Sequence, residues 1–477
     1  MNINFLFYII LYIILFNSFN ISYIVIPFNA LNKEKEKQEP NENLNIFKFF
    51  QNNFESQIYA KINIGTPKNF LQINLRMNNH GLTLGFLCDN DLLYEEYNYN
   101  INKSLTFYGD QNNKKYYTQN QWAFIGQDSF MFYSDIETKN EIILNNISFI
   151  YVPKDETNNF DKICGTLGLA LKAHYYLTEE VNFIKILKKY GYINTFDFSF
   201  YFTSETEGKL IIGEEPHYYF PTMFNANNLR KNNVLLDGYS NSGWKIEFSQ
   251  IYFNINDIKY KIKEGKTALF AIENNYIIGN KNYQKMIEDN FFKKYLDNNI
   301  CYYEKINNPK YVILICNKDS AFDINSFPTL YLYHRIFNYT FELTKDELFL
   351  EKNNKYIFLI FFWEYGLNYF TLGKIFLRKY LFTFNIDSKS VGFYNVKFQE
   401  FKKKNFLTLF FTIFGLIIIL IACIIGFFFA RKIYNRSRKK RFNELREDYE
   451  YVSYIENDVN YDNNDKNKIF VEIPNKS

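Results

Sequence analysis

The stretch Ile62–Phe86, "INIGTPKNFLQINLRMNNHGLTLGF", contains the pattern that decides the fold. Apolar and polar residues alternate on both sides of a Gly-Thr-Pro turn, which predicts two strands joined by a tight connection. A short polar segment, "RMNNH" at Arg76–His80, then interrupts the pattern before a third apolar run. What this segment does decides whether the chain is an enzyme.

The same β pattern continues from residue 47 to residue 397. Short runs rich in Ile, Phe, Tyr and Val are broken by Gly, Asn and Asp. Examples are Phe196–Phe202, Lys209–Gly213, Trp244–Ile255 and Tyr311–Cys316. Helical periodicity is clear only at 179–191, which ends at a glycine, and at 282–296. The sequence therefore predicts a two-lobed all-β protein.

The composition excludes several classes of function. The 477 residues are 47% hydrophobic and carry a net charge of +4, so nothing favours nucleic-acid binding. The five cysteines form no CxxC pair, and the four histidines are scattered, so we expect neither a metal nor a cofactor. The histidines are His80, His174, His217 and His334.

Two apolar segments indicate membrane targeting. Phe5–Ile26 lies at the N-terminus before the charged run Lys33–Glu39, which predicts a signal peptide or signal anchor at 1–27 and a polar linker at 28–46. Phe406–Ala430 carries no charge and is long enough to span a bilayer.

The segment after Phe406–Ala430 sets the expected topology. It begins with the basic run "RKIYNRSRKKR", which places residues 431–477 in the cytosol. We expect a single-pass type I membrane protein with a lumenal or extracellular domain and a disordered tail. Tyr449–Val452 in that tail matches the tyrosine-x-x-apolar pattern bound by vesicle-coat adaptors, a pattern that also occurs by chance.

Within the lumenal region, motifs in a fixed order resemble those of pepsin-like aspartic proteases, the group that includes the plasmepsins. The motifs are Tyr59–Phe70, Ile163–Ala170, Phe196–Tyr219, Gly243–Phe253, Phe327–Leu332 and, most specifically, Phe370–Val396. The resemblance implies a bilobal fold with an N-terminal lobe at 47–220 and a C-terminal lobe at 221–400.

The family's catalytic motif, Asp-Thr-Gly or Asp-Ser-Gly, is missing from all 477 residues. Aligned without gaps, its first copy falls on Arg76, Met77 and Asn78. Its second copy falls on Ala271, Ile272 and Glu273, followed by Asn274.

This loss removes the chemistry that the resemblance implies. The family's mechanism needs two adjacent carboxyl groups that share one proton, one activating a water and the other polarising the scissile carbonyl. Arg76 puts a permanent cation at one position and Ala271 leaves the other without a functional group. The resemblance therefore implies a pseudoprotease, whose degenerate positions are Arg76 and Ala271.

Other side chains are candidates for lining the family's cleft. Lys114–Phe130 is similar to the flap hairpin, with Tyr116 near the family's flap tyrosine. Tyr117 and Gln119 replace the glycines of that hairpin, which implies a stiffer lid. With Tyr116, the cleft candidates are Met77, Asn78, Glu273 and Asn274.

Arg76 and His80 each have two interpretations. Arg76 either pairs with Glu273 across the floor of the cleft or is solvated in an eroded loop. His80 either contacts a ligand or is a hydrated loop residue.

The cysteines suggest at least one disulfide. Cys301 and Cys316 lie at the ends of two predicted strands joined by a turn at Asn307–Pro309, so we expect them to pair across the hairpin. The resemblance implies a second possible pair, Cys88–Cys164. Cys423 lies inside the predicted membrane helix.

Three functions remain open. In the first, the chain is a pseudoprotease that binds a peptide or protein in the secretory route or at the cell surface. In the second, it is an active aspartic endopeptidase that uses other carboxylates such as Glu273 or Asp89. In the third, it is a structural surface protein whose cleft is unused.

Overall fold

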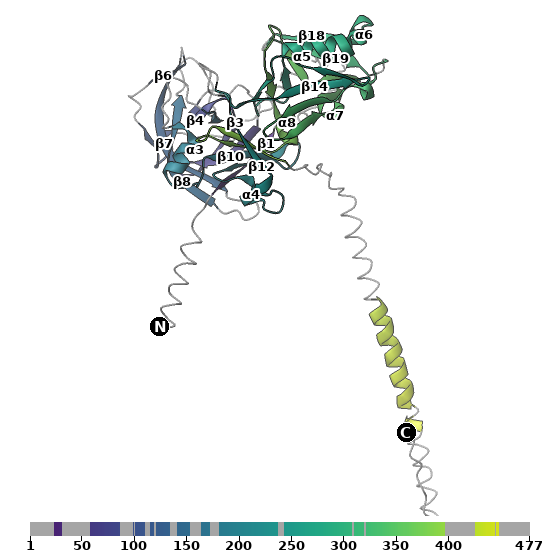
Figure 1. The fold of residues 1–477 in the computed structure, drawn as a ribbon. Helices are drawn as coiled ribbons and strands as arrows, with labels where there is room; N and C mark the ends of the chain where they lie inside the picture. The colour runs from purple at the N-terminus through teal and green to yellow at the C-terminus, as the bar shows by residue number, and fades with distance from the viewer. Residues whose placement is uncertain are drawn as a thin grey trace, which may run out of the picture. The chain divides into compact units, whose positions relative to one another are not determined.

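The computed structural model describes residues 23–30, 58–85, 99, 101–109, 115–118, 121–133, 141–152, 164–171, 181–236, 243–307, 310–318, 321–395, 425–443 and 445–447. The chain divides into two compact units, Met1–Phe398 and Gln399–Ser477. The first unit carries all the strands of the described residues (Figure 1).

A long sheet runs through the first unit. Among the described residues its fourteen strands are β1 (Ile24–Ala30), β2 (Ile58–Ile64), β3 (Asn69–Arg76), β4 (His80–Gly85), β5 (Tyr108–Gly109), β6 (Lys115–Thr118), β7 (Gln121–Tyr133), β8 (Glu141–Val152), β9 (Cys164–Leu169), β10 (Asp197–Phe202), β11 (Glu207–Ile212), β12 (Leu229–Asn233), β26 (Phe382–Asn385) and β27 (Ser390–Tyr394). Pairs β10–β26 and β12–β27 join the two halves of the sequence, so the first lobe is continuous with the end of the domain.

The second lobe is built on two further sheets. Across the described residues, nine strands form one of them: β13 (Lys245–Glu247), β16 (Thr267–Phe270), β17 (Ile277–Gly279), β18 (Cys301–Asn307), β19 (Lys310–Asn317), β22 (Phe349–Lys352), β23 (Lys355–Phe358), β24 (Ile360–Trp363) and β25 (Phe370–Leu372). Four form the other: β14 (Gln250–Ile255), β15 (Ile258–Lys261), β20 (Leu330–His334) and β21 (Tyr339–Leu343). The sequence predicts an all-β protein, and the structure is mostly β with several short helices.

The helices are short. They are α3 (Phe183–Lys189), α4 (Pro216–Tyr219), α5 (Lys281–Ile287), α6 (Lys293–Asp297), α7 (Lys345–Leu348) and α8 (Lys374–Lys379), with 3₁₀ turns η2 (Ile101–Lys103), η4 (Ala226–Asn228) and η6 (Ile324–Ser326). The π-helical turn η5 (Glu288–Phe292) joins α5 to α6. Both predicted helices are confirmed. The first begins at residue 183 because the Asn182 side chain accepts a hydrogen bond from the Lys185 N–H and caps it.

The Gly-Thr-Pro turn connects β2 to β3 as predicted. Gly65 has φ +75°, a conformation that glycine adopts without steric cost. The strands then pair in antiparallel register, and side chains alternate between the two faces of the sheet. Ile73 and Leu75 point into the core with exposures of 0% and 1%.

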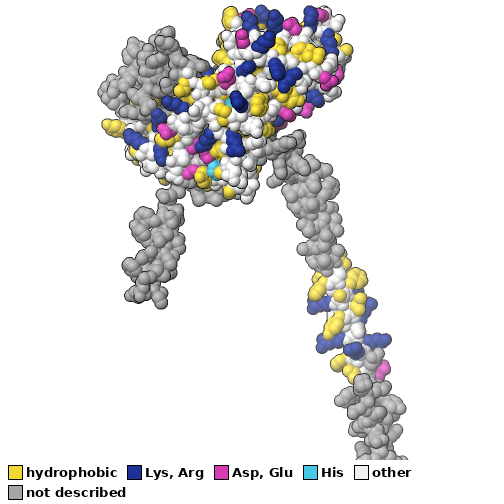
Figure 2. Space-filling view, in the orientation of Figure 1, with side chains coloured by type: hydrophobic (Ala, Val, Ile, Leu, Met, Phe, Trp, Pro, Cys, Tyr) yellow, Lys and Arg dark blue, Asp and Glu magenta, His cyan; other side chains and the backbone are white. Residues whose placement is uncertain are grey.

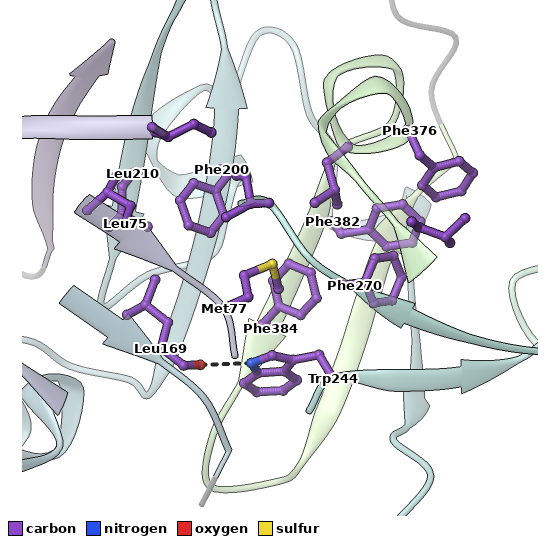
Figure 3. Close-up of a cluster of buried hydrophobic side chains, with 14 of the residues drawn as sticks. Leu75, Met77, Leu169, Phe200, Leu210, Trp244, Phe270, Phe376, Phe382 and Phe384 are labelled. Carbon is purple, nitrogen blue, oxygen red and sulfur yellow. Dashed lines mark hydrogen bonds between the residues drawn. The ribbon is translucent and has the colours of Figure 1, made fainter. Parts of the chain in front are cut away.

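One hydrophobic core extends through both lobes. At the lobe junction, the Trp244 ring packs in edge-to-face contacts with Phe198 and Phe384, and its Nε1–H donates to the Leu169 carbonyl oxygen at 2.8 Å. Figure 3 shows Trp244 and Met77 among the phenylalanines of this core. This packing holds the end of β3 and the end of β9 against the second lobe.

The first lobe begins earlier than the predicted boundary at residue 47. Residues 24–27 lie in the predicted N-terminal signal and residues 28–30 in the predicted linker, but the structure forms them into β1, which pairs with both β2 and β11. Ile24, Ile26 and Phe28 are fully buried. A short apolar run does not distinguish the hydrophobic part of a signal from a buried strand, which is the physical reason for this correction. Residues 1–22 lie outside the described part of the chain.

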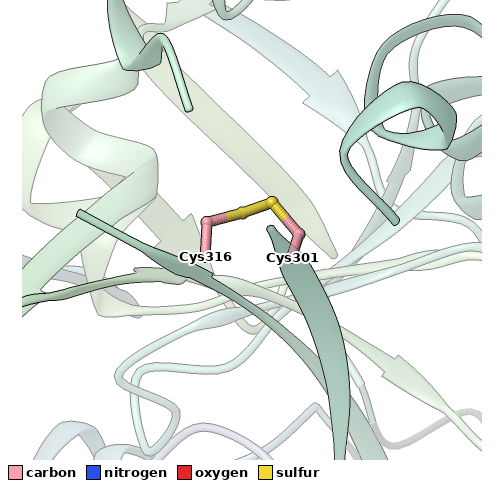
Figure 4. The surroundings of a disulfide bond; sticks show 2 residues. All are labelled: Cys301 and Cys316. Atoms are coloured by element: carbon pink, nitrogen blue, oxygen red, sulfur yellow. A yellow bond between two sulfur atoms is a disulfide. The ribbon is translucent and has the colours of Figure 1, made fainter. Parts of the chain in front are cut away.

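The disulfide between Cys301 and Cys316 is confirmed (Figure 4). The two residues are direct cross-strand partners in the hairpin of β18 and β19, and both are buried. Of the possible second pair, Cys88 and the Cys164 side chain lie outside the described residues, so that pair stays a prediction.

Removing the disulfide is expected to destabilise the second lobe. Cys301→Ser with Cys316→Ser opens a loop of 15 residues, which corresponds to about 3 kcal/mol in the chain-entropy account. When the disulfide of the wild type is reduced, we expect its denaturation midpoint to fall to that of the double variant. A double variant as stable as the oxidised wild type would contradict this.

The second unit contains a helix at 425–443 with exposed apolar and basic side chains (Figure 2). No helix among the described residues is long and apolar enough to cross a membrane. Most of the predicted span, residues 406–424, lies outside them, as does the sorting pattern at Tyr449–Val452.

Candidate functional site

Arg76 is the last residue of β3 and pairs with Gly168 of the parallel strand β9. Because Leu75 points into the core, strand alternation turns Arg76 to the opposite face of the sheet. Its side chain is half-buried. Met77, which follows, turns back into the core and is fully buried.

Ala271 directly follows β16 of the second lobe and is fully buried. Its N–H donates to the Leu372 carbonyl oxygen at 3.0 Å, and its own carbonyl accepts from the Asn274 N–H at 3.1 Å, closing a tight turn. The two positions predicted to be degenerate therefore each end a strand, and each begins a loop. Neither carries a carboxyl group.

Glu273 connects these two loops. Its Oε2 accepts from the Met77 backbone N–H at 3.2 Å, and its Oε1 accepts from Asn78 Nδ2 at 2.6 Å. One carboxyl group of the second lobe thus satisfies two donors of the first, which fixes the Arg76–Asn78 loop against the second lobe.

Burial raises the pKa of the Glu273 carboxyl above its ordinary value. The hydrogen bonds from Met77 and Asn78 and the charge of Arg76 oppose this rise. The Arg76 charge therefore acts on Glu273, as the predicted pairing requires. The direct contact between the two side chains stays a prediction.

Asn274 brings a buried lysine to the same loop. Its carbonyl oxygen accepts from the Lys374 backbone N–H at 2.6 Å. The Lys374 side chain is 6% exposed at the first turn of α8. Burial, with a smaller contribution from the Arg378 charge, lowers the pKa of Lys374 to about 7.

The predicted flap is a β-hairpin, as expected from Lys114–Phe130. Strands β6 and β7 pair from Lys115↔Ala123 to Thr118↔Gln121. Tyr116 lies opposite Trp122, but its side chain is outside what the structure describes, so its contact with a ligand stays a prediction. The same holds for the His80 side chain and for Asp89.

The structure brings together five of the residues singled out from the sequence: Arg76, Met77, Asn78, Glu273 and Asn274. Sequence reasoning missed two features nearby. Lys374 directly follows Leu-Gly in an apolar run, and these apolar neighbours are the sequence signal that could have indicated its burial. Asn63, Gln72 and Asn74 are polar at alternating strand positions and are nevertheless buried. Within the described residues, no group of His, Cys, Asp and Glu could hold a metal ion.

The comparisons with known proteins agree with this geometry. A family model described as eukaryotic aspartyl protease matches residues 57–396. No curated protein matches the sequence. Among solved structures, the chain is similar to basic 7S globulin from soybean, with 11% identity, TM-score 0.50, and coverage of 79% of this chain and 97% of that one. It is also similar to conglutin gamma, a basic 7S globulin from lupine seeds, with 12% identity and TM-score 0.52. That match covers 80% of this chain and 97% of conglutin gamma. At these identities the likeness concerns the fold alone.

Proposed function

The chain belongs to the eukaryotic aspartyl protease family, and we propose that it acts as a binding protein without peptidase activity. The observation that carries the proposal is the pair of strand ends at Arg76 and Ala271. The mechanism implied by the family needs a carboxyl group at each. This chain has a guanidinium at one and a methyl group at the other.

Neither residue can replace the missing acid or base. The guanidinium of Arg76 is a hydrogen-bond donor without an acceptor site, so it cannot take a proton from water. Ala271 has no titratable group. Because both positions lack a carboxyl group, restoring one of them would still leave no second carboxyl group with which it could share a proton.

Of the two carboxylates named for an active endopeptidase, Glu273 is the one that the structure describes, since Asp89 lies outside the described residues. Both of its oxygens already accept hydrogen bonds, from Met77 N–H and from Asn78. These contacts favour a structural role that ties the lobes together. They leave the endopeptidase as a second candidate that activity measurements decide.

The proposed ligand is a peptide or protein held at the lobe junction. We further propose that the domain is lumenal or extracellular and is anchored by the apolar segment 406–430, with the basic run after it in the cytosol. A structural surface protein with an unused junction is the third candidate. A structural surface protein would show no saturable peptide binding, whereas the proposed binding protein would.

The purified full chain in detergent is expected to show no pepstatin-sensitive hydrolysis of casein or of quenched fluorescent peptides between pH 4 and pH 6. Inhibitors of the pepstatin class owe much of their affinity to the catalytic pair, so the chain should also fail to bind pepstatin. Acid proteolysis that pepstatin abolishes would support the endopeptidase instead.

The matched variant for this test is Arg76→Asp. It restores one carboxyl group and should remain inactive, because Ala271 still supplies no second one. Cleavage by this single variant would show that the second site is misplaced, and the binding-protein proposal would then fail.

A further inference from the structure

The end of α4 and the loop after it present apolar side chains to solvent. Residues 218–223 have the sequence Tyr-Tyr-Phe-Pro-Thr-Met, and we call them the aromatic loop. Tyr218 is 64% exposed and Met223 is 46% exposed, and Pro221 between them is exposed as well. Apolar side chains that gather on one exposed loop indicate a surface that contacts a membrane or a partner.

The inner side of the aromatic loop is packed, so the loop has a fixed shape. The Phe220 ring lies 4.6 Å from the Tyr201 ring and 6.1 Å from the Phe224 ring between centroids. The Phe220 N–H donates to the Pro216 carbonyl oxygen. The Met223 and Phe224 N–H groups both donate to the Phe220 carbonyl oxygen. These backbone groups would keep their hydrogen bonds if lipid replaced the water outside.

The chain leaves the domain beside the aromatic loop. Asn395, the residue after β27, donates its N–H to the Asn228 carbonyl oxygen at 3.1 Å. Asn228 ends η4, which begins three residues after the aromatic loop. From Asn395 the ten residues 396–405 lead to the apolar segment 406–430, and ten residues bridge at most about 36 Å. The segment that we propose as the anchor therefore starts within reach of this loop.

The N-terminal apolar sequence joins the domain at the same place. Residues 5–22 are mostly apolar and lead directly to Tyr23. The Tyr23 ring makes an edge-to-face contact with Tyr219 of the aromatic loop, with 5.2 Å between centroids. His217 of α4 lies 2.7 Å from the Tyr394 hydroxyl of β27, which pairs with β12, and Figure 1 shows α4 and β12 at one edge of the first unit. Both sequences predicted to enter a membrane thus meet the domain next to the aromatic loop.

The charges around the aromatic loop have both signs. On β11, on β12 and just before α4, the Lys, Arg, Asp and Glu residues are Lys209, Arg230, Lys231, Glu207, Glu214 and Glu215. Lys231 pairs with Glu215, and the Lys209 ammonium lies 5.3 Å from the centroid of the Tyr219 ring. Attraction to a partner must therefore come from the apolar and aromatic side chains. This favours the surface of a neutral bilayer over a strongly charged partner.

We propose that the aromatic loop docks into the surface of the membrane that anchors the chain, with Tyr218, Pro221 and Met223 among the lipid headgroups. Tyrosine is enriched at this boundary because its ring is apolar and its hydroxyl is polar. The short connection to the anchor raises the effective concentration of the loop at the bilayer, so a weak contact is sufficient. Docking fixes which side of the domain faces the membrane. The inference rests on the proposed anchoring by residues 406–430.

The test places the full chain with Tyr218→Trp in phosphatidylcholine liposomes whose lipid tails are either ordinary or brominated. Bromine quenches indole fluorescence only at close contact. The emission of the added tryptophan is taken as the difference from the wild type, so that the three native tryptophans cancel. We expect brominated lipid to reduce this emission at least about twofold.

The matched control for this reporter is Tyr108→Trp. Tyr108 is 76% exposed on β5, which lies at the opposite end of the long sheet from β12. Its added emission should be the same in both kinds of lipid. Equal quenching of the two reporters would show that contact with lipid is not specific to the aromatic loop, and the inference would fail.

Further outcomes separate this inference from its premise. A chain that does not float with the liposomes would overturn the proposed anchoring and the inference with it. A chain that floats while Tyr218→Trp is not quenched would leave the anchoring intact and overturn the inference alone. An unquenched emission that shifts to shorter wavelength as the protein concentration rises would assign the aromatic loop to contact with a second copy of the chain.

A charge in the aromatic loop tests insertion directly. Thr222 is exposed between Pro221 and Met223, so Thr222→Asp leaves the packing of Phe220 in place but adds a carboxylate that is costly to take out of water. In the Tyr218→Trp background it should reduce the quenching at least about twofold. Leu105→Asp, at a position 84% exposed outside the loop, is the control and should change nothing. Quenching that survives Thr222→Asp would mean that the anchor alone brings the ring near lipid, which overturns the inference.

Discussion

Trp244→Ala is expected to lower the free energy of unfolding of the first unit by about 3–5 kcal/mol, the usual range for removing a large aromatic side chain from a core. Trp244 is fully buried and packs against Phe198 and Phe384 at the lobe junction. The substitution leaves a cavity and also leaves the Leu169 carbonyl oxygen without its donor. Denaturant titration of the full chain in detergent measures the loss.

Two further variants show how much of this loss comes from the hydrogen bond and how much depends on the burial of the ring. Trp244→Phe keeps an aromatic ring but removes the Nε1–H donor, so we expect a smaller loss of about 1–3 kcal/mol. Trp363→Ala is the control, because Trp363 on β24 is only half-buried and should cost less than Trp244→Ala. Equal losses for the two alanine variants would contradict the assignment of Trp244 to the centre of the junction.

The sequence predicted those features that depend on local periodicity. Strand alternation was sufficient to place Ile73 and Leu75 inside and Arg76 on the other face, and the hairpin spacing was sufficient to pair Cys301 with Cys316. Both follow from the two-residue period of a strand and from turn residues that lie next to one another in the chain.

Features that depend on distant segments could not be predicted in the same way. Strand β1 is recognisable only from its partners β2 and β11, which lie far along the chain. The acceptor role of Glu273 and the bond from Trp244 to Leu169 join residues 196 and 75 positions apart. The alternation of Gln72 and Asn74 resembles that of an exposed strand face, so burial of these amides contradicts the ordinary expectation for polar residues.

The buried lysine gives the second large effect. Lys374→Met should raise the free energy of unfolding by about 2–4 kcal/mol below pH 7, because it removes an ammonium group that folding takes out of water. The methionine side chain has a similar length and no charge. The Lys374 backbone N–H still donates to Asn274, so the loop that contains Glu273 keeps its conformation.

The gain should depend on pH with a defined sign. The pKa of Lys374 is about 7 in the folded chain and 10.5 as its ordinary value. Between these values the unfolded chain binds a proton that the folded chain does not, so the wild type gains stability as pH rises from about 7. Below pH 7 both states are protonated and that stability is lost. The advantage of Lys374→Met is therefore largest at pH 6 and shrinks steadily toward pH 10.

Measuring the variant against the wild type at each pH isolates Lys374 from the other titrating groups. Glu273 and Asp197, whose pKa values burial raises, are present in both proteins, so their contributions cancel in the difference where they do not interact with Lys374. Lys285→Met on the exposed side of α5 is the control and should give a difference near zero at every pH. A gain for Lys374→Met that stays constant from pH 6 to pH 10 would mean that its ammonium group keeps its ordinary pKa. Lys374 would then stay charged inside the fold across this pH range, beside the loop that contains Glu273.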